Sequence, residues 1–247
     1  LVPHAVRLEA ARAYIEHVAM RLDGEDVDLQ VEGSIAKYFA TEAGDAAAND
    51  AIQAFGGYGY TREYEVEKIK RDVKILTIYE GTSEIQLSII SLFRMRETVR
   101  SKGGYYEGMA AELRDIPVDC GGDVLAEALR VTNSLVIGVR KAKLAKSQYT
   151  MFLLGDMITW CEVAHSLCLK AAGDQASSGR SVEFLRASAR LFAREAAEKV
   201  YVNALKVIHG SDSGSPIDVP ELTQLDPGRI MHGMFSDMHL IAYELRR

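Results

Sequence analysis

The sequence predicts an all-α protein, and two observations support this fold class. Apolar residues recur at steps of three and four over several long stretches, which is the spacing of an amphipathic helix. Between these stretches lie short segments rich in glycine, proline and polar residues, and no segment carries a strand signal of any length. We therefore expect helices joined by loops and packed around an apolar core.

Composition narrows the classes of function. The chain has 247 residues, of which 48% are apolar, an ordinary fraction for a globular protein of one large domain or two small ones. Its net charge is −6 and no basic stripe is present, so nucleic acid is not an expected partner. The three cysteines and six histidines show no metal-binding spacing, so we expect no metal site. Free thiols fit a reducing compartment, the bacterial cytosol or an equivalent such as the mitochondrial matrix.

Two helices are expected in the first quarter of the chain. Residues 4–22 form an amphipathic stripe, and the charged residues 23–26 end it. A second helix is expected over residues 34–55, where Gly56 and Gly57 would stop it in the way that glycine does after a helix. No apolar run approaches the roughly 18 residues that span a bilayer.

The next helices flank an acidic turn. Val66, Ile69, Val73 and Leu76 repeat at helical steps, and the turn Tyr79-Glu80-Gly81-Thr82 follows them. Ser83 and Gln86 match a capping box, with Ser83 at the N-cap and Gln86 at N3, opening a helix that runs to about Arg100. A carboxylate on such a turn could act as a base on a ligand bound at the helix end, although an ordinary cap region is the commoner meaning of this pattern.

The second half of the chain predicts a separate helical bundle. Residues 103–104 and 115–122 are rich in glycine, which marks a boundary. Helices are expected over residues 123–147, 148–172, 181–209 and 229–245, with loops over residues 173–179 and 210–227. Four such helices would form one bundle with its own core.

Two blocks resemble the C-terminal signature of the flavin-dependent acyl-CoA dehydrogenases. They are residues 53–60, QAFGGYGY, and residues 71–86, which include Arg71-Asp72 and the run from Ile78 to Gln86, IYEGTSEIQ. The resemblance implies a partial acyl-CoA dehydrogenase C-terminal helical bundle over residues 1–101, a linker over residues 102–122, and an additional helical bundle over residues 123–247. The last segment resembles the extra domain of the very-long-chain acyl-CoA dehydrogenases.

The resemblance also implies a reaction and its residues. Members of this family convert an acyl-CoA to its trans-2-enoyl-CoA with FAD, as in fatty acid β-oxidation. Glu80 matches the base that removes the α-proton, and Gly81 would lie beside the substrate thioester. The implied FAD contacts form two groups: Gln53, Ala54, Phe55, Gly56 and Gly57, which would meet the flavin dinucleotide of a partner subunit, and Thr82, Ser83 and Glu84, which would approach its adenosine side.

The same resemblance implies binding partners and a longer protein of which this chain is a part. We expect an acyl-CoA substrate, a homodimer or a dimer of dimers, and electron-transfer flavoprotein as the electron acceptor. The family's amino-terminal helical domain and middle β-domain have no counterpart here and Leu1 is not a methionine, so we expect a piece of a longer protein that is inactive by itself.

Three alternatives stay open at this point. An acyl-CoA oxidase shares the Tyr-Glu-Gly turn, and a non-catalytic helical interaction module would share the helices without the chemistry. The basic run from Arg140 to Lys146 is most simply a solvated helix face, although it could make a weak contact with an anionic membrane surface.

Overall fold

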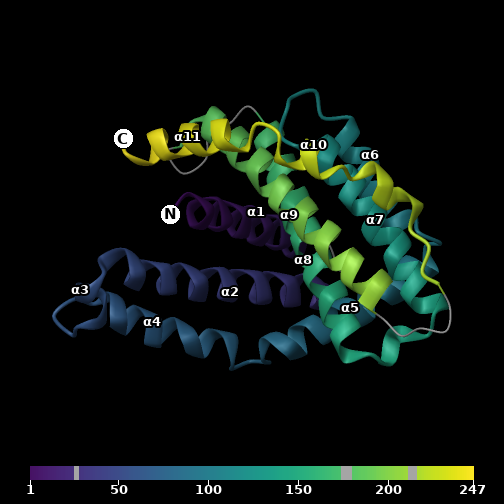
Figure 1. Ribbon diagram of the computed structural model, residues 1–247, viewed down its shortest axis with the longest axis horizontal. Helices are drawn as coiled ribbons and strands as arrows, with labels where there is room; N and C mark the ends of the chain where they lie inside the picture. The colour runs from purple at the N-terminus through teal and green to yellow at the C-terminus, as the bar shows by residue number, and fades with distance from the viewer. Residues whose placement is uncertain (25–27, 174–179, 211–215) are drawn as a thin grey trace.

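The computed structural model describes residues 1–24, 28–173, 180–210 and 216–247 (Figure 1). Every regular element in these ranges is a helix, which confirms the all-α prediction. The α-helices are α1 (Val2–Gly24), α2 (Gln30–Phe55), α3 (Gly57–Tyr60), α4 (Val66–Lys74), α5 (Ser83–Arg100), α6 (Gly104–Arg114), α7 (Gly122–Lys141), α8 (Gln148–Ala172), α9 (Val182–Gly210), α10 (Pro227–Met231) and α11 (Met234–Leu245). Short 3-10 turns cover Ile75–Thr77, Leu144–Lys146 and Pro220–Gln224.

The helices form two groups that share α1 and α5 as neighbours. The long helix α2 runs beside α4, and the short helix α3 joins their far ends (Figure 1). On the other side, α7, α8 and α9 pack against one another, and the C-terminal helix α11 lies on α9. Helix α1 contacts both α2 and α8, and α5 contacts both α2 and α8. Helix α5, which follows the acidic turn, therefore contacts helices from both halves of the chain.

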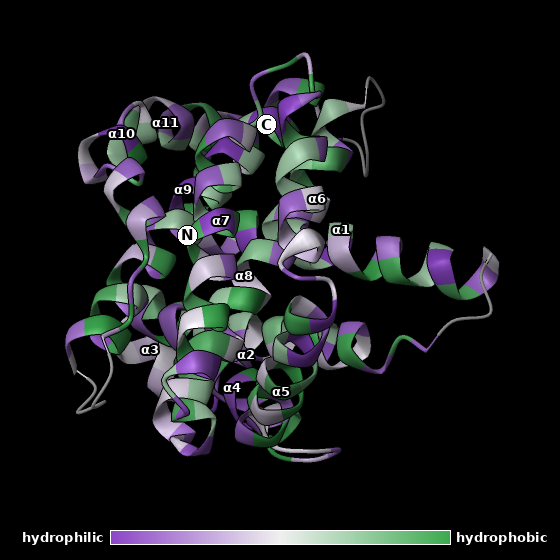
Figure 2. Ribbon diagram, turned by 90° about the vertical axis from the view of Figure 1, so that its right-hand side faces the viewer, coloured by the Kyte–Doolittle hydropathy of each residue, from purple (hydrophilic) through white to green (hydrophobic). Residues whose placement is uncertain are grey.

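The hydrophobic core runs through both predicted bundles without a break. One cluster of buried residues includes Val6, Ile35 and Ile90 from the first segment together with Leu129 and Phe192 from the second. Figure 2 shows the amphipathic pattern that builds this core, with alternating hydrophobic and hydrophilic bands along α1. The division into domains at residues 101 and 123 remains a prediction, and the helices on either side of it are packed together.

Helix α8 is the central helix of this core. Contrary to the expectation from the sequence, α8 is long and apolar enough to span a membrane, but 72% of its apolar stretch is buried inside the protein. Gly155 of α8 marks its closest approach to α5, because a Cβ atom there would come within 2.7 Å of the Leu87 carbonyl oxygen. Only a glycine allows these two helices to approach so closely.

A buried polar network crosses the same interface. The Arg94 guanidinium of α5 donates hydrogen bonds of 2.7 Å and 2.8 Å to the Glu162 carboxylate of α8, and one of 3.0 Å to Glu32 of α2. The Tyr106 hydroxyl of α6 donates to Glu162 at 3.2 Å, and the Tyr105 ring lies 4.9 Å from the guanidinium carbon. These contacts pair the buried charges and join four helices.

Helix boundaries depart from the sequence-based prediction in several places. Helix α2 begins at Gln30 rather than at residue 34. Helix α6 lies within the predicted linker and buries Tyr106, Ala110 and Leu113. Helix α7 ends at Lys141 rather than residue 147, because the backbone turns left-handed at Lys143. The predicted last helix is split into α10 and α11 by Gly233, which has a positive φ of 77°.

Parts of three predicted connections lie outside the described residues. They are residues 25–27 of the charged segment after the first helix, residues 174–179 of the turn after α8, and residues 211–215 of the loop after α9. The described remainder of that last loop contains the 3-10 turn Pro220–Gln224 and buries Ile217 and Val219.

Candidate functional site

Glu80 stands on a tight turn directly before α5. Its φ of 53° and the φ of 88° at Gly81 both lie in the left-handed region, which is uncommon for a residue with a side chain. The Glu80 side chain is exposed. Among the described residues, none forms a hydrogen bond or ion pair with its carboxylate. The turn thus presents a free carboxylate to the solvent.

The backbone of this turn is held from two sides. The Lys37 ammonium of α2 donates a hydrogen bond of 2.8 Å to the Gly81 carbonyl oxygen. The Gln86 amide donates to the carbonyl oxygens of Glu80 at 3.0 Å and of Gly81 at 3.4 Å. A Cβ atom on Gly81 would lie only 2.7 Å from the Gln86 Nε2 atom, so this contact requires glycine. The carboxylate is free while its backbone is fixed.

The start of α5 corrects the predicted capping box by one residue. The N-cap is Thr82, whose hydroxyl oxygen accepts a hydrogen bond of 3.4 Å from the Ile85 amide. Ser83 is the first helical residue, and its buried hydroxyl donates to the Glu42 carboxylate of α2. Since Gln86 is bound to the turn carbonyls, it does not reach back to the amide of the N-cap.

Glu84 places a negative charge in the first turn of α5. The pKa of its carboxyl group is lowered, first because the carboxylate accepts a hydrogen bond from its own backbone N–H and then because of the Thr82 side chain. Anions are favoured at a helix N-terminus because its free N–H groups carry partial positive charge. Here an acidic side chain of the protein already occupies that environment.

The residues from Gln53 to Gly57 lie at the opposite end of α2. All five are exposed, and α2 ends at Phe55 as predicted, with Gly56 at a φ of 59°. A Cβ atom added to Gly56 or Gly57 would meet nothing within 4 Å, so the backbone here is open to a ligand. From Lys37 to Gln53, α2 rises about 24 Å along its axis. One chain therefore carries the two predicted groups of site residues at separate places.

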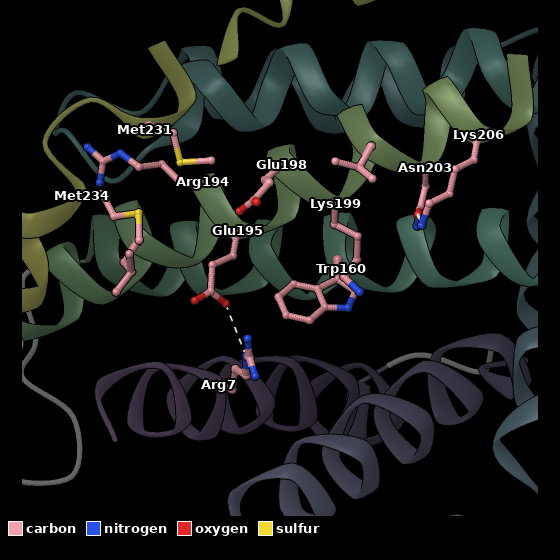
Figure 3. A pocket seen from close by; sticks show the side chains of 12 residues that line it. Arg7, Trp160, Arg194, Glu195, Glu198, Lys199, Asn203, Lys206, Met231 and Met234 are labelled. Carbon is pink, nitrogen blue, oxygen red and sulfur yellow. Dashed lines mark hydrogen bonds and ion pairs between the residues drawn. The ribbon is translucent and has the colours of Figure 1, made fainter. Parts of the chain in front are cut away.

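A groove of about 500 Å³ between α8, α9 and the C-terminal helices holds none of the predicted site residues (Figure 3). Arg7 pairs with Glu195 at 3.3 Å, and Lys199 pairs with Asp156 at 2.9 Å. Arg7 and Lys199 also lie over the Trp160 ring, at 5.3 Å and 4.7 Å from its centroid. Burial raises the pKa of Glu195, and Arg7 opposes this change. These four charges are paired within the protein, whereas Glu198, which also lines the groove, is exposed.

Comparison with known proteins finds a family that the region around the turn resembles. A family model described as the acyl-CoA dehydrogenase C-terminal domain matches residues 1–92. Residues 1–92, called the dehydrogenase segment below, are therefore similar to the C-terminal domain of this family. The dehydrogenase segment includes Glu80, the turn that holds it and the whole of α2.

Two relatives illustrate this similarity. An acyl-CoA dehydrogenase of Bacillus subtilis is 46% identical over 98 residues, which is 40% of this chain and 26% of the relative. The CarC subunit of the caffeyl-CoA reductase-Etf complex of Acetobacterium woodii is 41% identical over 87 residues, 35% of this chain and 23% of the relative. The matches thus span about a quarter of the length of these curated relatives.

A solved structure extends the fold likeness beyond the dehydrogenase segment. An acyl-CoA dehydrogenase from Bacillus anthracis, complexed with FAD, aligns with a TM-score of 0.78 and 19% sequence identity. The alignment covers 99% of this chain and 47% of that protein. The helical arrangement described above, including α7 to α11, is therefore one that occurs in an acyl-CoA dehydrogenase.

Sequence reasoning missed the residues that hold the turn. Lys37 and Glu42 lie more than 40 positions before their partners, Gly81 and Ser83, and no local pattern links them. Gln86 was singled out, but for a capping role that it does not have. Within the described ranges, no group of three or more histidine, cysteine, aspartate or glutamate side chains is arranged to hold a metal ion.

Proposed function

We propose that the chain supplies the C-terminal part of a flavin-dependent acyl-CoA dehydrogenase in which Glu80 is the catalytic base. The observation that supports this role is the combination of a free, exposed carboxylate with a backbone fixed by Lys37 and Gln86. A general base must be accessible and held in one position, and this turn meets both conditions.

The proposed reaction divides the work between the protein and its cofactor. Glu80 takes the proton from the carbon next to the thioester carbonyl and holds it on a carboxyl oxygen. Gly81 has no side chain, so the substrate can approach the turn closely. Bound FAD would supply the acceptor for the hydride that leaves the β-carbon. The double bond then forms between the α- and β-carbons.

The C-terminal end of α2 fits a bound dinucleotide better than the start of α5 does. Gly56 and Gly57 leave open backbone over which a ligand could lie. At α5, the Glu84 carboxylate would repel a phosphate, and the Ser83 hydroxyl is bound to Glu42. We propose that Gln53–Gly57 contact the flavin dinucleotide, and that Thr82, Ser83 and Glu84 meet an uncharged part on its adenosine side.

The length of α2 supports an assembly of at least two chains. Lys37 and Gln53, about 24 Å apart by helical rise, would serve the sites of different subunits in a homodimer or a dimer of dimers. Electron-transfer flavoprotein is the proposed electron acceptor, supported by the relative named as a subunit of an Etf complex. Cytosolic or matrix location remains part of this proposal.

A second candidate is the reverse reaction. The relative from Acetobacterium woodii is named a caffeyl-CoA reductase, so the same site can be proposed to add hydrogen to an α,β-double bond. By microscopic reversibility, Glu80 would then donate the proton to the α-carbon. Supplying reduced electron donor with an enoyl-CoA, or oxidised acceptor with an acyl-CoA, would separate the two directions.

The test is Glu80→Gln in a longer protein that contains this chain and both helical and β-domains of the family. We expect exchange of the α-proton and acyl-CoA-dependent dye reduction to fall by about 100- to 10,000-fold. Flavin absorbance should be retained. The matched control is Glu198→Gln, an exposed glutamate of α9 far from the turn, which should leave both rates unchanged.

Other outcomes would favour the alternatives. Retained dehydrogenation in the Glu80→Gln protein would remove Glu80 from the base role. Direct production of hydrogen peroxide from oxygen would favour an oxidase. A wild-type protein with neither flavin nor acyl-CoA turnover would favour an interaction module. We expect residues 1–247 alone to bind no stoichiometric flavin, because the other domains contribute most of the cofactor pocket in our proposal.

A further inference from the structure

Cys120 and Cys168 lie in contact although they are 48 positions apart. The Cys168 thiol of α8 donates a hydrogen bond of 3.2 Å to the Cys120 carbonyl oxygen. Cys161, two turns earlier on α8, has a different partner, because its sulfur lies 3.6 Å from the Thr132 hydroxyl oxygen. All three cysteines are free thiols.

The surroundings make the two thiols chemically different. The pKa of Cys120 is lowered, first by the hydrogen bond from Cys168 and also by the backbone N–H of Gly122, while burial and Asp119 oppose this effect. Gly122 is the first residue of α7, and a helix N-terminus favours a thiolate. The pKa of Cys168 is raised by its hydrogen bond to Cys120 and by burial. Cys120 is therefore the nucleophile of the pair.

Cys120 is buried, but it lies in an irregular segment that borders a surface groove. It lines a surface groove of about 500 Å³ formed by the connection between α6 and α7, whose lining includes Leu113, Pro117 and Asp123. Residues 116–121 of this connection have no helical structure, whereas Cys168 lies within the last two turns of α8. Formation of a disulfide would require the connection to bring the two sulfurs to the bonding distance of about 2 Å.

We propose that Cys120 and Cys168 form a reversible oxidation site that hydrogen peroxide converts into an intramolecular disulfide. The Cys120 thiolate attacks one peroxide oxygen, the O–O bond breaks, and the departing hydroxide takes a proton to become water. The Cys168 sulfur then attacks the sulfenic sulfur of Cys120. The S–S bond forms, the S–O bond breaks, and the hydroxide leaves with the Cys168 proton as a second water. The two sulfurs together lose two electrons to the peroxide.

The bond would fasten the α6–α7 connection to α8. Helix α8 packs against α5, which follows the turn that carries Glu80. The disulfide would therefore restrict the motion of the α6–α7 connection next to a helix that contacts α5. A dithiol reductant would reverse it.

The test is oxidation of the reduced chain by hydrogen peroxide, followed by peptide mapping without reductant. We expect one cross-link, between the peptides that contain Cys120 and Cys168, with a mass about 2 Da below the sum of the two reduced peptides. Titration of the denatured protein should find one free thiol in place of three. Dithiothreitol should restore all three. A map with no such cross-link, or one that joins Cys161 to either partner, would overturn the proposal.

Serine variants give the matched comparison. Cys168→Ser should abolish the cross-link and leave a sulfenic acid on Cys120 that dimedone labels. Cys161→Ser should leave the cross-link intact, because the Cys161 sulfur lies beside the Thr132 hydroxyl group, two helical turns from Cys168. Equal dimedone labelling of Cys120 and Cys161 in the Cys168→Ser protein would contradict the assignment of Cys120 as the nucleophile. The wild-type map decides the matter even if a variant does not fold.

Discussion

At the residue scale, the turn before α5 depends on the absence of one side chain. Gly81 has a φ of 88°, and a Cβ atom there would come within 2.7 Å of the Gln86 amide nitrogen. We expect Gly81→Ala to destabilise the fold by about 1–2 kcal/mol through backbone strain. It should also displace Gln86 from the turn carbonyls and lower activity in the longer protein. Urea unfolding would measure the stability.

Gly44 provides the control for this substitution. It lies inside α2, and a Cβ atom there would meet nothing within 4 Å. Gly44→Ala should stabilise the protein by about 0.5–1 kcal/mol, because alanine is the better helix former. Equal effects of the two substitutions would mean that the turn imposes no special requirement for glycine.

A second prediction at this scale concerns pH. Burial lowers the pKa of His165 from its usual 6.5 to about 4, with a further contribution from His17. The Glu112 carboxylate lies 3.1 Å from Nε2 and opposes this shift, but its side chain is 62% exposed, so water screens it. The unfolded chain binds the proton more readily than the folded one in this range. Stability should therefore fall by up to about 3 kcal/mol as pH decreases from about 6.5 to about 4.

The measurement is the free energy of unfolding against pH for the wild type, His165→Gln and the control His239→Gln. The ring of His239 is exposed on α11. Only in the His165 variant should the decrease in the free energy of unfolding between about pH 6.5 and pH 4 become smaller. A slope that is unchanged in the His165 variant would show that other groups carry the acid sensitivity.

At the scale of the element, the spacing of apolar residues predicted most helices. The features that it missed depend on contacts between residues far apart in the sequence. Helix α8 matches its predicted range of 148–172, because apolar residues cover nearly its whole length. Helix α6 was missed because it is short and begins among glycines, and its two tyrosines are stabilised by Arg94 and Glu162 from distant helices. The Cys120–Cys168 contact and the Lys37 anchor were equally invisible to local patterns.

The network around Arg94 makes a quantitative prediction. Arg94→Gln would leave Glu162 buried without its cationic partner, while Glu32 would keep Arg21 at 3.3 Å, and the loss should cost about 3–5 kcal/mol. The control is Arg114→Gln, which removes an exposed ion pair with Glu107 and should change stability by less than about 1 kcal/mol. Thermal unfolding of the two variants would compare them. Similar small losses would mean that the buried network adds little to stability.

At the scale of the whole molecule, the sequence predicted the fold class and the family of the first segment, but not the shared core. Val6, Ile35 and Ile90 pack into the same cluster as Leu129 and Phe192, so each segment covers apolar surface of the other. The dehydrogenase signature is local and could be identified from consecutive residues. The packing of α8 against α1 and α5 joins segments more than 50 positions apart, and no spacing in the sequence indicates it.

This shared core predicts the behaviour of separated segments. Residues 1–101 expressed alone should show no cooperative unfolding transition, because the face that α8 covers would be exposed to water. Mixing this piece with residues 102–247 should restore the helical signal and one transition. Deletion of residues 246–247 is a control that should change neither. Independent cooperative folding of the first piece would support the division into domains instead.

Helix α2 is a single unbroken helix that joins the two proposed groups of site residues. This has a consequence for how the protein could evolve. Inserting one residue near its middle would turn one end by about 100° relative to the other and advance it by about 1.5 Å. The lysine that steadies the acidic turn and the glycines that would receive a neighbour's nucleotide could then no longer face their targets together. The length of α2 and the relative rotation of its two ends thus depend on each other. This helix should tolerate substitutions far better than insertions or deletions.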